Sequence, residues 1–497
     1  DDTANSYANT HVAAGTLVGN ARSISGSISN AGTVVFDQAT DATFAGTIAG
    51  LGGTAGSMVK QGAGNLTLTG VSSLNWSITG GELTTAAGRF SGNADIGTGA
   101  TFTFRQNADA SYGGQLTGAG RVVKTGFATL TLSGTNAYSG GTELIGGRLS
   151  VSADANLGAA SGGLTFNGGT LLATASFDTS RSVSLQHTGV FDVAADATLG
   201  LTGAVSGTGD LQKRGSGTLR LDNVSNGYGN TQVEAGTLIG NARSISGNIN
   251  NIGTVVFDQA TDESFAGTIR GFDGASGSMV KQGAGKLTLT GISSLNWSIT
   301  GGDLTAAAER FLGNAKIGTG ASLTFDQSAD ASYGGALIGT GNFIKSGMGS
   351  LTLTSTNSYT GATTIDGGAL IVNGAIDSHL GGVAVNSGGT LSGMGTIAGT
   401  VTVNSGGTLS GLSGTTLTMG SLTLNTGSSV NVTLGVPSTT ALFNVTGNLT
   451  LGGTLNVSGQ GDFGAGVYRL IDYGGTLTNN GLAIGTTPGG TPASDFF

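Results

Sequence analysis

Residues 118–151, GAGRVVKTGFATLTLSGTNAYSGGTELIGGRLSV, contain the pattern that decides the fold. The stretch combines a Lys-x-Gly step at Lys124, a Leu-Thr-Leu run, an Asn-x-Tyr turn from Asn136 to Tyr138, and a Gly-Gly pair before a second alternating run. Alternation of apolar and polar residues at period two indicates strands with one buried face. Glycine pairs between such runs are typical of tight turns. The stretch therefore predicts short strands separated by turns.

Versions of this stretch recur along the chain, which is the first feature that a repeat protein shows. The series Lys-x-Gly-x-Gly/Ala-x-Leu-x-Leu begins at Lys60, Lys124, Lys213, Lys281 and Lys345. Asn-x-Tyr follows at Asn136, Asn226 and Asn357, and stands alone at Asn5. The copies after Lys60 and Lys281 carry Ser-Leu-Asn-Trp instead, with Trp76 and Trp297.

A longer repeat contains these short ones. The segment Gly15–Gly26 returns as Gly236–Gly247, and the offset of 221 residues holds without a gap for the lysines, tryptophans and tyrosines of both copies. Even Asn5–Thr10 matches Asn226–Thr231, so the repeat is already under way at residue 1. We expect this chain to be cut from a longer protein whose true N-terminus lies upstream.

Composition supports a strand-and-turn fold. Glycine supplies 95 of 497 residues, there are only 3 prolines, and glycine has no three-residue period, which excludes collagen. Charged residues make up 9% of the chain, whereas disordered chains normally carry more charge and fewer β-branched residues. Cysteine is absent, which excludes disulfides, thiolate metal sites and a cysteine nucleophile.

Charge and hydropathy argue against nucleic-acid binding and against a membrane-spanning helix. The net charge is −9 and the 19 Lys and Arg residues form no basic run, so nucleic acid is not an expected partner. No stretch of about 20 apolar residues is present, so no membrane-spanning helix is expected. No signal peptide is visible at the start of the chain.

The smallest repeat predicts the architecture. Residues 383–393, VAVNSGGTLSG, return as VTVNSGGTLSG at 401–411, a period of 18 residues. Short strands at such a period predict an all-β chain folded as a right-handed parallel β-helix, or β-solenoid, in a single elongated rod. At about 20 residues per coil the rod would contain roughly 25 coils. An array of antiparallel sandwiches is the alternative, although an 18-residue unit is too small to be a sandwich domain.

The repeats also predict three regions along the rod. We expect a first long repeat unit over residues 1–221, a second copy over 222–380, and regular coils over 381–497. No helix is predicted beyond single turns at Ala86–Phe90 and Ala306–Phe311.

Several of these segments resemble the passenger-associated repeats of bacterial autotransporters. The resemblance rests on Lys124-Thr-Gly with its Asn-Ala-Tyr-Ser-Gly-Gly-Thr, on the matching series after Lys345, and on Gly388–Ile397, GGTLSGMGTI. Residues 444–455 and 467–473 resemble the part that precedes an autochaperone and barrel. The resemblance implies a β-helical passenger displayed outside the outer membrane. The chain stops at Phe497 without the C-terminal barrel of that family, so it is expected to be an excised passenger.

Candidate catalytic groups are few, and no catalytic, cofactor or metal residue is predicted. Of the three histidines, His11, His187 and His379, none lies in a protease motif, and the long repeat replaces His11 with Gln232. A polysaccharide-cleaving β-helix would use paired acids. The candidates are Asp37, Asp41, Asp258, Asp262 and Glu263, and a duplicated, solvated turn is the preferred interpretation. Weak calcium binding by these acids has no supporting motif.

Aromatic and lysine positions of the repeat have structural and functional interpretations. Tyr7, Tyr138, Tyr228 and Tyr359 are expected to pack over coil corners with their hydroxyls in water, and a row of exposed ligand-binding tyrosines is the alternative. Trp76 and Trp297 are expected in the core rather than stacking on sugars. The repeated lysines are expected to be solvated turn residues, with a cationic ladder as the alternative.

These observations favour a non-enzymatic surface passenger, anchored to the bacterial outer membrane through its own C-terminal barrel. Its expected partners are host cell-surface or matrix molecules, or the same protein on neighbouring cells, and no cofactor is expected. A passive stalk that presents a missing N-terminal region is the second hypothesis, and a polysaccharide-active enzyme is the third.

Overall fold

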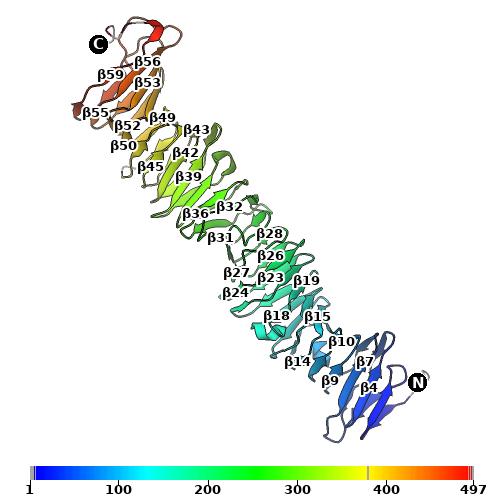
Figure 1. Ribbon diagram of the computed structural model, residues 1–497. Coiled ribbons are helices and arrows are strands. Elements are labelled where there is room, and N and C mark those ends of the chain that lie inside the picture. The colour runs from blue at the N-terminus through cyan, green and yellow to red at the C-terminus, as the bar shows by residue number, and fades with distance from the viewer. Residues whose placement is uncertain (1–4, 6, 378–379, 491, 493, 495–497) are drawn as a thin grey trace. The chain divides into compact units, whose positions relative to one another are not determined.

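The computed structural model describes residues 5, 7–377, 380–490, 492 and 494. The chain divides into two compact units, residues 1–254 (unit 1) and 255–497 (unit 2). Both units are parallel β-solenoids, and the chain makes about 21 turns in all (Figure 1). The prediction of an all-β parallel β-helix is thus confirmed.

The strands of unit 1 form sheets in which each strand pairs with strands one turn away. One short sheet has the order β1 (Asn9–Val12), β3 (Ser27–Asn30) and β6 (Ile48–Gly50). The second has the order β2 (Thr16–Gly19), β4 (Thr33–Asp37), β7 (Ser57–Gln61), β9 (Trp76–Ile78), β11 (Ala94–Ile96) and β14 (Leu116–Thr117). The third has the order β5 (Ala42–Phe44), β8 (Asn65–Leu68), β10 (Glu82–Thr85), β12 (Thr101–Arg105), β15 (Arg121–Thr125), β17 (Thr142–Leu144), β19 (Leu164–Phe166), β22 (Val183–Leu185) and β25 (Val205–Gly207).

The remaining strands of unit 1 continue these faces toward its C-terminal end. One series has the order β13 (Ala110–Tyr112), β16 (Thr129–Leu132), β18 (Arg148–Val151), β20 (Thr170–Ala173), β23 (Gly189–Val193), β26 (Leu211–Arg214), β28 (Thr231–Val233) and β30 (Ile249–Asn251). The other has the order β21 (Phe177–Thr179), β24 (Thr198–Leu201), β27 (Thr218–Leu221) and β29 (Thr237–Gly240).

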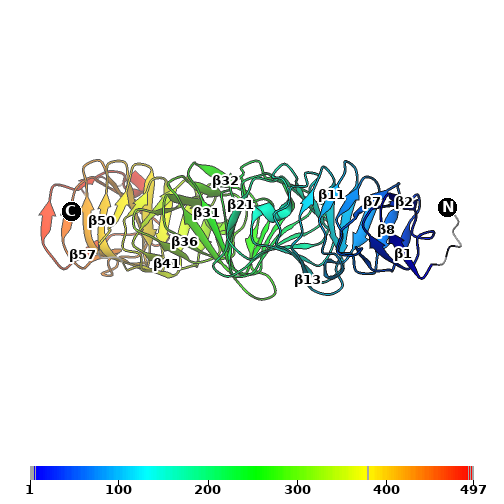
Figure 2. The same cartoon turned by 90° about the horizontal axis from the view of Figure 1, so that it is seen from below.

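Unit 2 repeats the arrangement (Figure 2). Its first series has the order β31 (Thr254–Asp258), β34 (Ser278–Gln282), β36 (Asn296–Ile299), β38 (Ala315–Ile317) and β41 (Leu337–Gly339). Its longest has the order β32 (Glu263–Phe265), β35 (Leu287–Leu289), β37 (Asp303–Ala306), β39 (Ser322–Asp326), β42 (Asn342–Ser346), β45 (Thr363–Ile365), β48 (Val383–Val385), β50 (Thr396–Val403), β52 (Leu417–Leu424), β54 (Phe443–Val445) and β57 (Ile471–Tyr473).

Shorter strands extend this face of unit 2. In the longest sheet, β44 (Thr356–Asn357) pairs with β47 (Ala375–Ile376), which pairs with β50, and β55 (Leu449–Leu451) lies between β52 and β58 (Leu477–Asn479). The last sheet has the order β40 (Ala331–Tyr333), β43 (Ser350–Leu353), β46 (Gly368–Val372), β49 (Gly389–Gly393), β51 (Thr408–Leu412), β53 (Ser429–Leu434), β56 (Thr454–Gly459) and β59 (Ala483–Ile484). Strand β33 spans Ile269–Arg270.

Alternation within each strand builds the core. Leu66 of β8, Leu83 of β10, Phe102 of β12 and Val122 of β15 occupy one register position of successive coils, and all four are buried. Like residues stacked at the strand spacing of about 4.8 Å form a continuous apolar column. The period-two alternation of the sequence therefore places the core inside the coils, as predicted.

The expected number of coils is too high because many coils are longer than the assumed length of about 20 residues. Val383 pairs with Val401, one 18-residue period away, whereas Phe44 pairs with Leu68 across a longer coil. Longer turns between strands use up the extra residues, so about 21 turns form instead of roughly 25.

Among the described residues, helix is confined to short 3-10 turns. They are η1 (Ala87–Arg89), η2 (Asp154–Leu157), η3 (Ala308–Arg310) and η4 (Pro488–Gly490). Turns η1 and η3 lie where the sequence predicts single turns, and η2 was not predicted. In the described part of the chain, no helix has the length and hydropathy needed to cross a membrane.

Candidate binding surface

The five lysines of the Lys-x-Gly series lie inside the coils. The side chains of Lys60, Lys124, Lys213, Lys281 and Lys345 have no exposed surface. Each ammonium group donates to the carbonyl oxygens of the next two residues and to a carbonyl one coil further along the chain, at 2.6–3.2 Å. We call this arrangement of one ammonium and three carbonyls a lysine cage. The expectation of solvated turn residues is therefore wrong.

The cage forms because the lysine occupies an inward position of its strand. Val122 and Lys124 lie two residues apart in β15, so both side chains point into the coil. The turn after the lysine needs Gly126, whose φ is 77° and where a Cβ atom would lie 2.2 Å from the carbonyl oxygen of Gln106. Glycine thus aims two turn carbonyls at the ammonium group. A buried charge that meets three acceptors is satisfied without a carboxylate partner.

Burial changes the acid–base properties of the caged groups. Burial lowers the pKa of Lys124 and Lys213 to about 8, although nearby Asp109 and Asp192 partly oppose the shift. The pKa values of the other three caged lysines are lowered for the same reason. Because each cage is closed on all sides by protein, these amines are not available to a ligand.

The asparagines of Asn-x-Tyr tie three coils together. The Oδ1 atom of Asn136 accepts a hydrogen bond from the backbone N–H of Leu116 at 2.9 Å, and its Nδ2 donates to the carbonyl of Asn156 at 2.6 Å. Leu116 lies one coil before Asn136 and Asn156 one coil after it. Asn226 and Asn357 make the same pair of contacts, with Val205 and Ser244, and with Leu337 and Ala375. We call this contact the asparagine staple.

The repeated aromatic residues belong to the core. Tyr138, Tyr228 and Tyr359 are buried, and their hydroxyls hydrogen-bond to Thr142, Thr231 and Thr363. The expectation that these hydroxyls lie in water is wrong, and so is the alternative of an exposed ligand-binding row. Only Tyr7 among the four is exposed. Trp76 and Trp297 are buried and stack near Phe36 and Phe257, as predicted.

Two of the candidate acids accept hydrogen bonds from backbone N–H groups of turns. Asp41 accepts the backbone N–H of Asn65 at 2.8 Å, and Asp262 accepts that of Lys286 at the same distance. Asp37 and Asp258 are exposed at strand ends. The preferred interpretation of a turn copied with the repeat thus agrees with the contacts of these acids.

The candidate catalytic and metal-binding groups do not converge on a site. His11 and His187 are exposed without an imidazole hydrogen bond to any described residue, and His379 lies outside the described residues. Throughout the described ranges, no group of three His, Asp or Glu residues could hold a metal ion.

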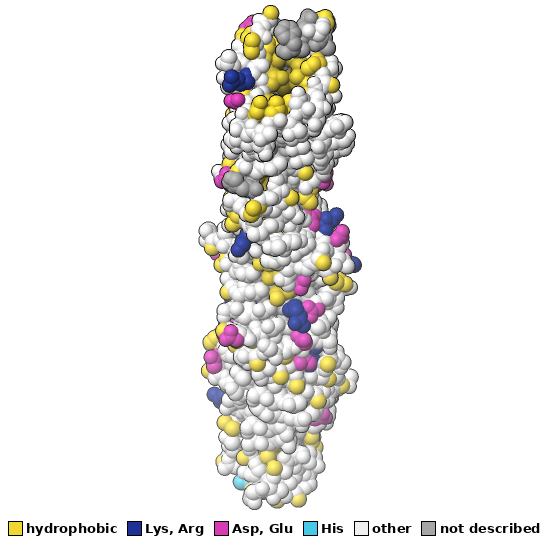
Figure 3. Space-filling view, turned by 90° about the vertical axis from the view of Figure 1, so that its left-hand side faces the viewer, with side chains coloured by type: hydrophobic (Ala, Val, Ile, Leu, Met, Phe, Trp, Pro, Cys, Tyr) yellow, Lys and Arg dark blue, Asp and Glu magenta, His cyan; other side chains and the backbone are white. Residues whose placement is uncertain are grey.

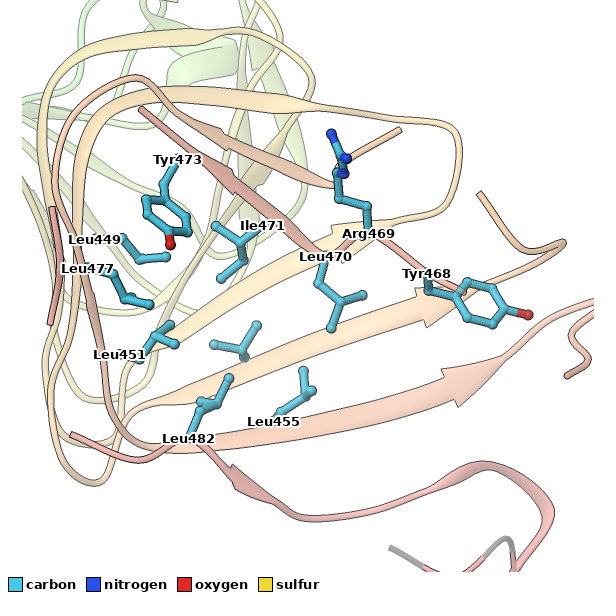
Figure 4. A pocket seen from close by; sticks show the side chains of 11 residues that line it. Leu449, Leu451, Leu455, Tyr468, Arg469, Leu470, Ile471, Tyr473, Leu477 and Leu482 are labelled. Atoms are coloured by element: carbon cyan, nitrogen blue, oxygen red, sulfur yellow. The ribbon is translucent and has the colours of Figure 1, made fainter. Parts of the chain in front are cut away.

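A hollow of about 350 Å³ opens near the C-terminal end of unit 2, where Figure 3 shows hydrophobic side chains gathered on the surface. Leu451, Leu455, Leu470 and Leu482 point toward one another across it (Figure 4). Apart from Arg469 and two tyrosines, its lining is aliphatic. The hollow is thus the open interior of the last coils and holds no catalytic pair.

A row of outward threonines crosses six coils of unit 2. The row consists of register partners on β45, β48, β50, β52, β55 and β58: Thr364, Ala384, Thr402, Thr423, Thr450 and Thr478. None of its five hydroxyl groups makes a hydrogen bond to a described residue. We call it the threonine row. At the spacing of neighbouring strands, about 4.8 Å, it presents free donors and acceptors in register.

A ladder of amides runs beside the threonine row, two residues further along the chain and directly after the ends of β45, β48, β50 and β52. The Nδ2 atom of Asn386 donates to Asp366 at 2.7 Å, that of Asn404 to Asn386 at 2.8 Å, and that of Asn425 to Asn404 at 3.0 Å. We call these four residues the asparagine ladder. Each ladder amide uses one N–H and keeps a second for an outside partner. Row and ladder together form the hydroxyl–amide strip.

The equivalent surface of unit 1 carries charge. Its register row consists of Thr67, Thr84, Thr103, Val123, Glu143, Thr165, Ser184 and Ser206. Glu143 pairs with Arg121 at 3.2 Å, and the 221-residue offset places Thr364 at the position of Glu143. Thr84 donates to Glu82, and Thr103 is buried. The hydroxyls of Thr67, Thr165 and Ser184 also have no described partner. The unit 1 row thus differs from the threonine row in its charge at Glu143 and in its positions that are buried or already hydrogen-bonded.

Comparison with known proteins accounts for the repeat. Residues 58–85, 122–151, 211–239, 279–306 and 343–372 match the passenger-associated-transport-repeat family, and each match contains one caged lysine. Over 296 residues the chain is 36% identical to the adhesin BmaC autotransporter of Brucella suis biovar 1 (strain 1330). In these repeats the chain is similar to autotransporter passengers, and we call it the passenger below. No solved structure matches it. The passenger's match covers 56% of its own length but only 8% of that relative.

The cages, the staples and the strip were not predicted from the sequence. The sequence nevertheless contains patterns that indicate the cages and the strip. In the passenger, Phe343 and Lys345 share the parity of an inward face, which predicts burial of the lysine. The Val-Thr-Val-Asn and Leu-Thr-Leu-Asn runs at 401–404 and 422–425 place Thr and Asn on one outward face. The buried ion pair of Arg181 with Asp154, at 2.8 Å, left no such signal because its partners are 27 residues apart.

Proposed function

We propose that the passenger is a non-enzymatic surface adhesin whose hydroxyl–amide strip contacts molecules of a host cell surface or extracellular matrix. The observation that carries the proposal is the threonine row, whose hydroxyls have no described hydrogen-bond partner. Beside it lie ladder amides that each keep one N–H without a described partner. Such groups gain little from folding alone and are free to bond a partner.

Repetition gives such a surface its strength. A single hydrogen bond exchanged with water contributes only about 1 kcal/mol. Several weak contacts in a fixed register add up when one partner engages them together. Adhesion through the strip therefore needs a partner that spans several coils.

The resemblance and the relative support this assignment. The relative is named an adhesin and an autotransporter, and the repeats are named for their association with transported passengers. Asp41 and Asp262 each accept a backbone N–H of a turn, which speaks against the polysaccharide hydrolase considered from the sequence.

The test is adherence of the purified passenger, on beads, to host cells and matrix proteins. The variant T402E/T450E places two charges in the threonine row, with Thr423 left between them. Its matched control, T165E/S206E, places the same charges in the row of unit 1, with Ser184 between them. Adherence lost only in T402E/T450E supports the proposal, and equal adherence of both variants contradicts it.

Self-association between passengers on neighbouring cells is the alternative use of the same strip. A second copy has the same strand spacing, so the spacing of its row and ladder equals that of the first copy. Concentration-dependent light scattering that T402E/T450E abolishes favours this alternative over adhesion to host molecules.

A passive stalk is the second candidate function. The lysine cages and asparagine staples tie consecutive coils together, and a 221-residue duplication suits a part that sets length. Bead adherence that is absent in the wild-type passenger as well as in both variants favours the stalk.

A further inference from the structure

We propose that the hydroxyl–amide strip of unit 2 binds a neutral, extended β-1,4-linked polysaccharide lying across its coils. The inference rests on the proposed adhesin function and names the chemical class of its partner. It follows from the charge, spacing and free hydrogen-bonding groups of the strip.

The charge of the strip selects a neutral partner. The threonine row has no ionisable residue, and the ladder has one, the carboxylate of Asp366. An anionic polymer would meet this carboxylate with no lysine or arginine in row or ladder to balance it. Hydroxyls and amides suit a partner that is itself rich in hydroxyls, because both sides donate and accept.

The spacing of the strip selects a repeating, extended partner. Neighbouring positions of the row are one strand apart, about 4.8 Å, and row and ladder are two residues apart, about 7 Å. A β-1,4-linked glycan is a flat ribbon with one ring per similar step and hydroxyl groups along both edges. Laid over the strip, one edge faces Thr402, Thr423 and Thr450, and the other faces the ladder.

A peptide partner fits less well. An extended peptide adds to a sheet through the unpaired backbone groups of an edge strand. Here β50 and β52 are interior strands with neighbours on both sides, so only side chains face outward. The row contains no aromatic residue and no apolar side chain larger than Ala384. Because strand addition and apolar contacts are both excluded here, the strip can bind a polymer only through side-chain hydrogen bonds.

The hydrogen-bonding capacity matches this use. Thr364, Thr402, Thr423 and Thr450 are half-buried, and their hydroxyls have no described partner. Asn425 ends the ladder with its Oδ1 accepting no described donor. Because each contact is weak, affinity should grow with the length of the glycan.

The experiment is sedimentation of the whole passenger with insoluble cellulose, chitin and a β-1,3-glucan. Cellulose and chitin should deplete the wild-type protein, and the β-1,3-glucan, whose chain is not a flat ribbon, should not. T402E/T450E should lower depletion at least tenfold, and T165E/S206E should leave it unchanged. A soluble hexasaccharide should compete weakly. Failure of wild-type binding, or binding indifferent to T402E/T450E, overturns the inference.

A parallel measurement separates this inference from the adhesin proposal. If T402E/T450E lowers adherence to cells while no glycan binds the wild-type protein, the polysaccharide inference is wrong and the adhesin proposal stands. If T402E/T450E abolishes self-association and no glycan binds, the partner of the strip is a second copy. If glycan binds and cells do not, the adhesin proposal fails and the glycan inference stands.

Discussion

The ammonium group of Lys124 lies 3.0 Å from the carbonyl oxygen of Gly146, which belongs to the next coil along the chain. This contact completes a cage that the turn carbonyls of Thr125 and Gly126 begin. The same relationship links Lys345 to Gly367 in unit 2. Each passenger-associated repeat thus contains one buried cation that joins two coils.

Removal of a caged ammonium group should destabilise the coils around it. Lys124→Met keeps roughly the length of the side chain and removes the ammonium donor of the Gly126 and Gly146 carbonyls, whereas the Thr125 carbonyl still accepts the N–H of Gln106. We expect a loss of about 2 to 4 kcal/mol in the free energy of unfolding, since each unsatisfied buried group costs about 1–3 kcal/mol and the cage relaxes in part. Urea unfolding followed by circular dichroism measures it.

The matched control is Lys286→Met, because Lys286 is exposed on the strand-turn surface of unit 2. This variant should stay within about 0.5 kcal/mol of the wild type. Equal unfolding midpoints for Lys124→Met and the wild type would show that the cage contributes nothing.

Loss of an asparagine staple should destabilise the three coils that it joins. Asn136→Ala leaves the buried N–H of Leu116 and the carbonyl of Asn156 unpaired. The expected cost is about 2 to 4 kcal/mol, because two buried groups lose their partner. Hydrogen exchange should rise at Leu116. The exposed Asn107 supplies the control, and Asn107→Ala should leave both stability and exchange unchanged.

Stability should have a maximum in the alkaline range. Lys124 and Lys213 have pKa values of about 8 when folded, whereas unfolded lysine titrates near 10.4. From about pH 8 to 10 the unfolded chain therefore holds protons that the folded chain has released, and the free energy of unfolding rises with pH.

Above about pH 10 the buried tyrosines reverse this trend. Burial raises the pKa of Tyr138 to about 12, so tyrosines ionise first in the unfolded chain and stability falls. Urea midpoints at successive pH values test both limbs. A steady decline of the urea midpoint from pH 8 upward would contradict this prediction. It would mean that the hydrogen bonds to the carbonyls outweigh burial and keep the lysine pKa from being lowered.

Binding through the strip should be insensitive to salt. The threonine row is uncharged, so screening of charges has little to act on. Adherence of the passenger to its target should change less than twofold between about 50 mM and 0.5 M NaCl. A steep decline with salt would point to the ion pairs of unit 1, such as Arg121 with Glu143, as the contact surface.

The architecture could be predicted from the sequence because period-two alternation and glycine turns fix it locally. Leu66, Leu83 and Phe102 share one inward position, and their alternation with polar residues is visible without a structure. The buried lysines were misjudged because a charge is normally taken as exposed, although Lys345 has the same parity as Phe343. Their acceptors are two carbonyls of the following turn and one carbonyl a coil away, and a backbone carbonyl cannot be recognised from the type of its residue.

The candidate strip was harder to predict, for a similar reason. Thr402 and Thr423 become neighbours only through the register of β50 and β52, which depends on the length of the turn between them. The contrast with Glu143 in unit 1 is visible in the aligned repeats, but its meaning depends on which face is exposed. Register and exposure are properties of the folded coils.

The measurement that tests the account most directly is adherence of three bead-displayed proteins to host cells: wild type, T402E/T450E and T165E/S206E. Circular dichroism and urea midpoints must first show that all three are folded. The account predicts adherence by the wild type and by T165E/S206E, and at least tenfold less by T402E/T450E. Equal adherence of the two variants would contradict the assignment of binding to the hydroxyl–amide strip.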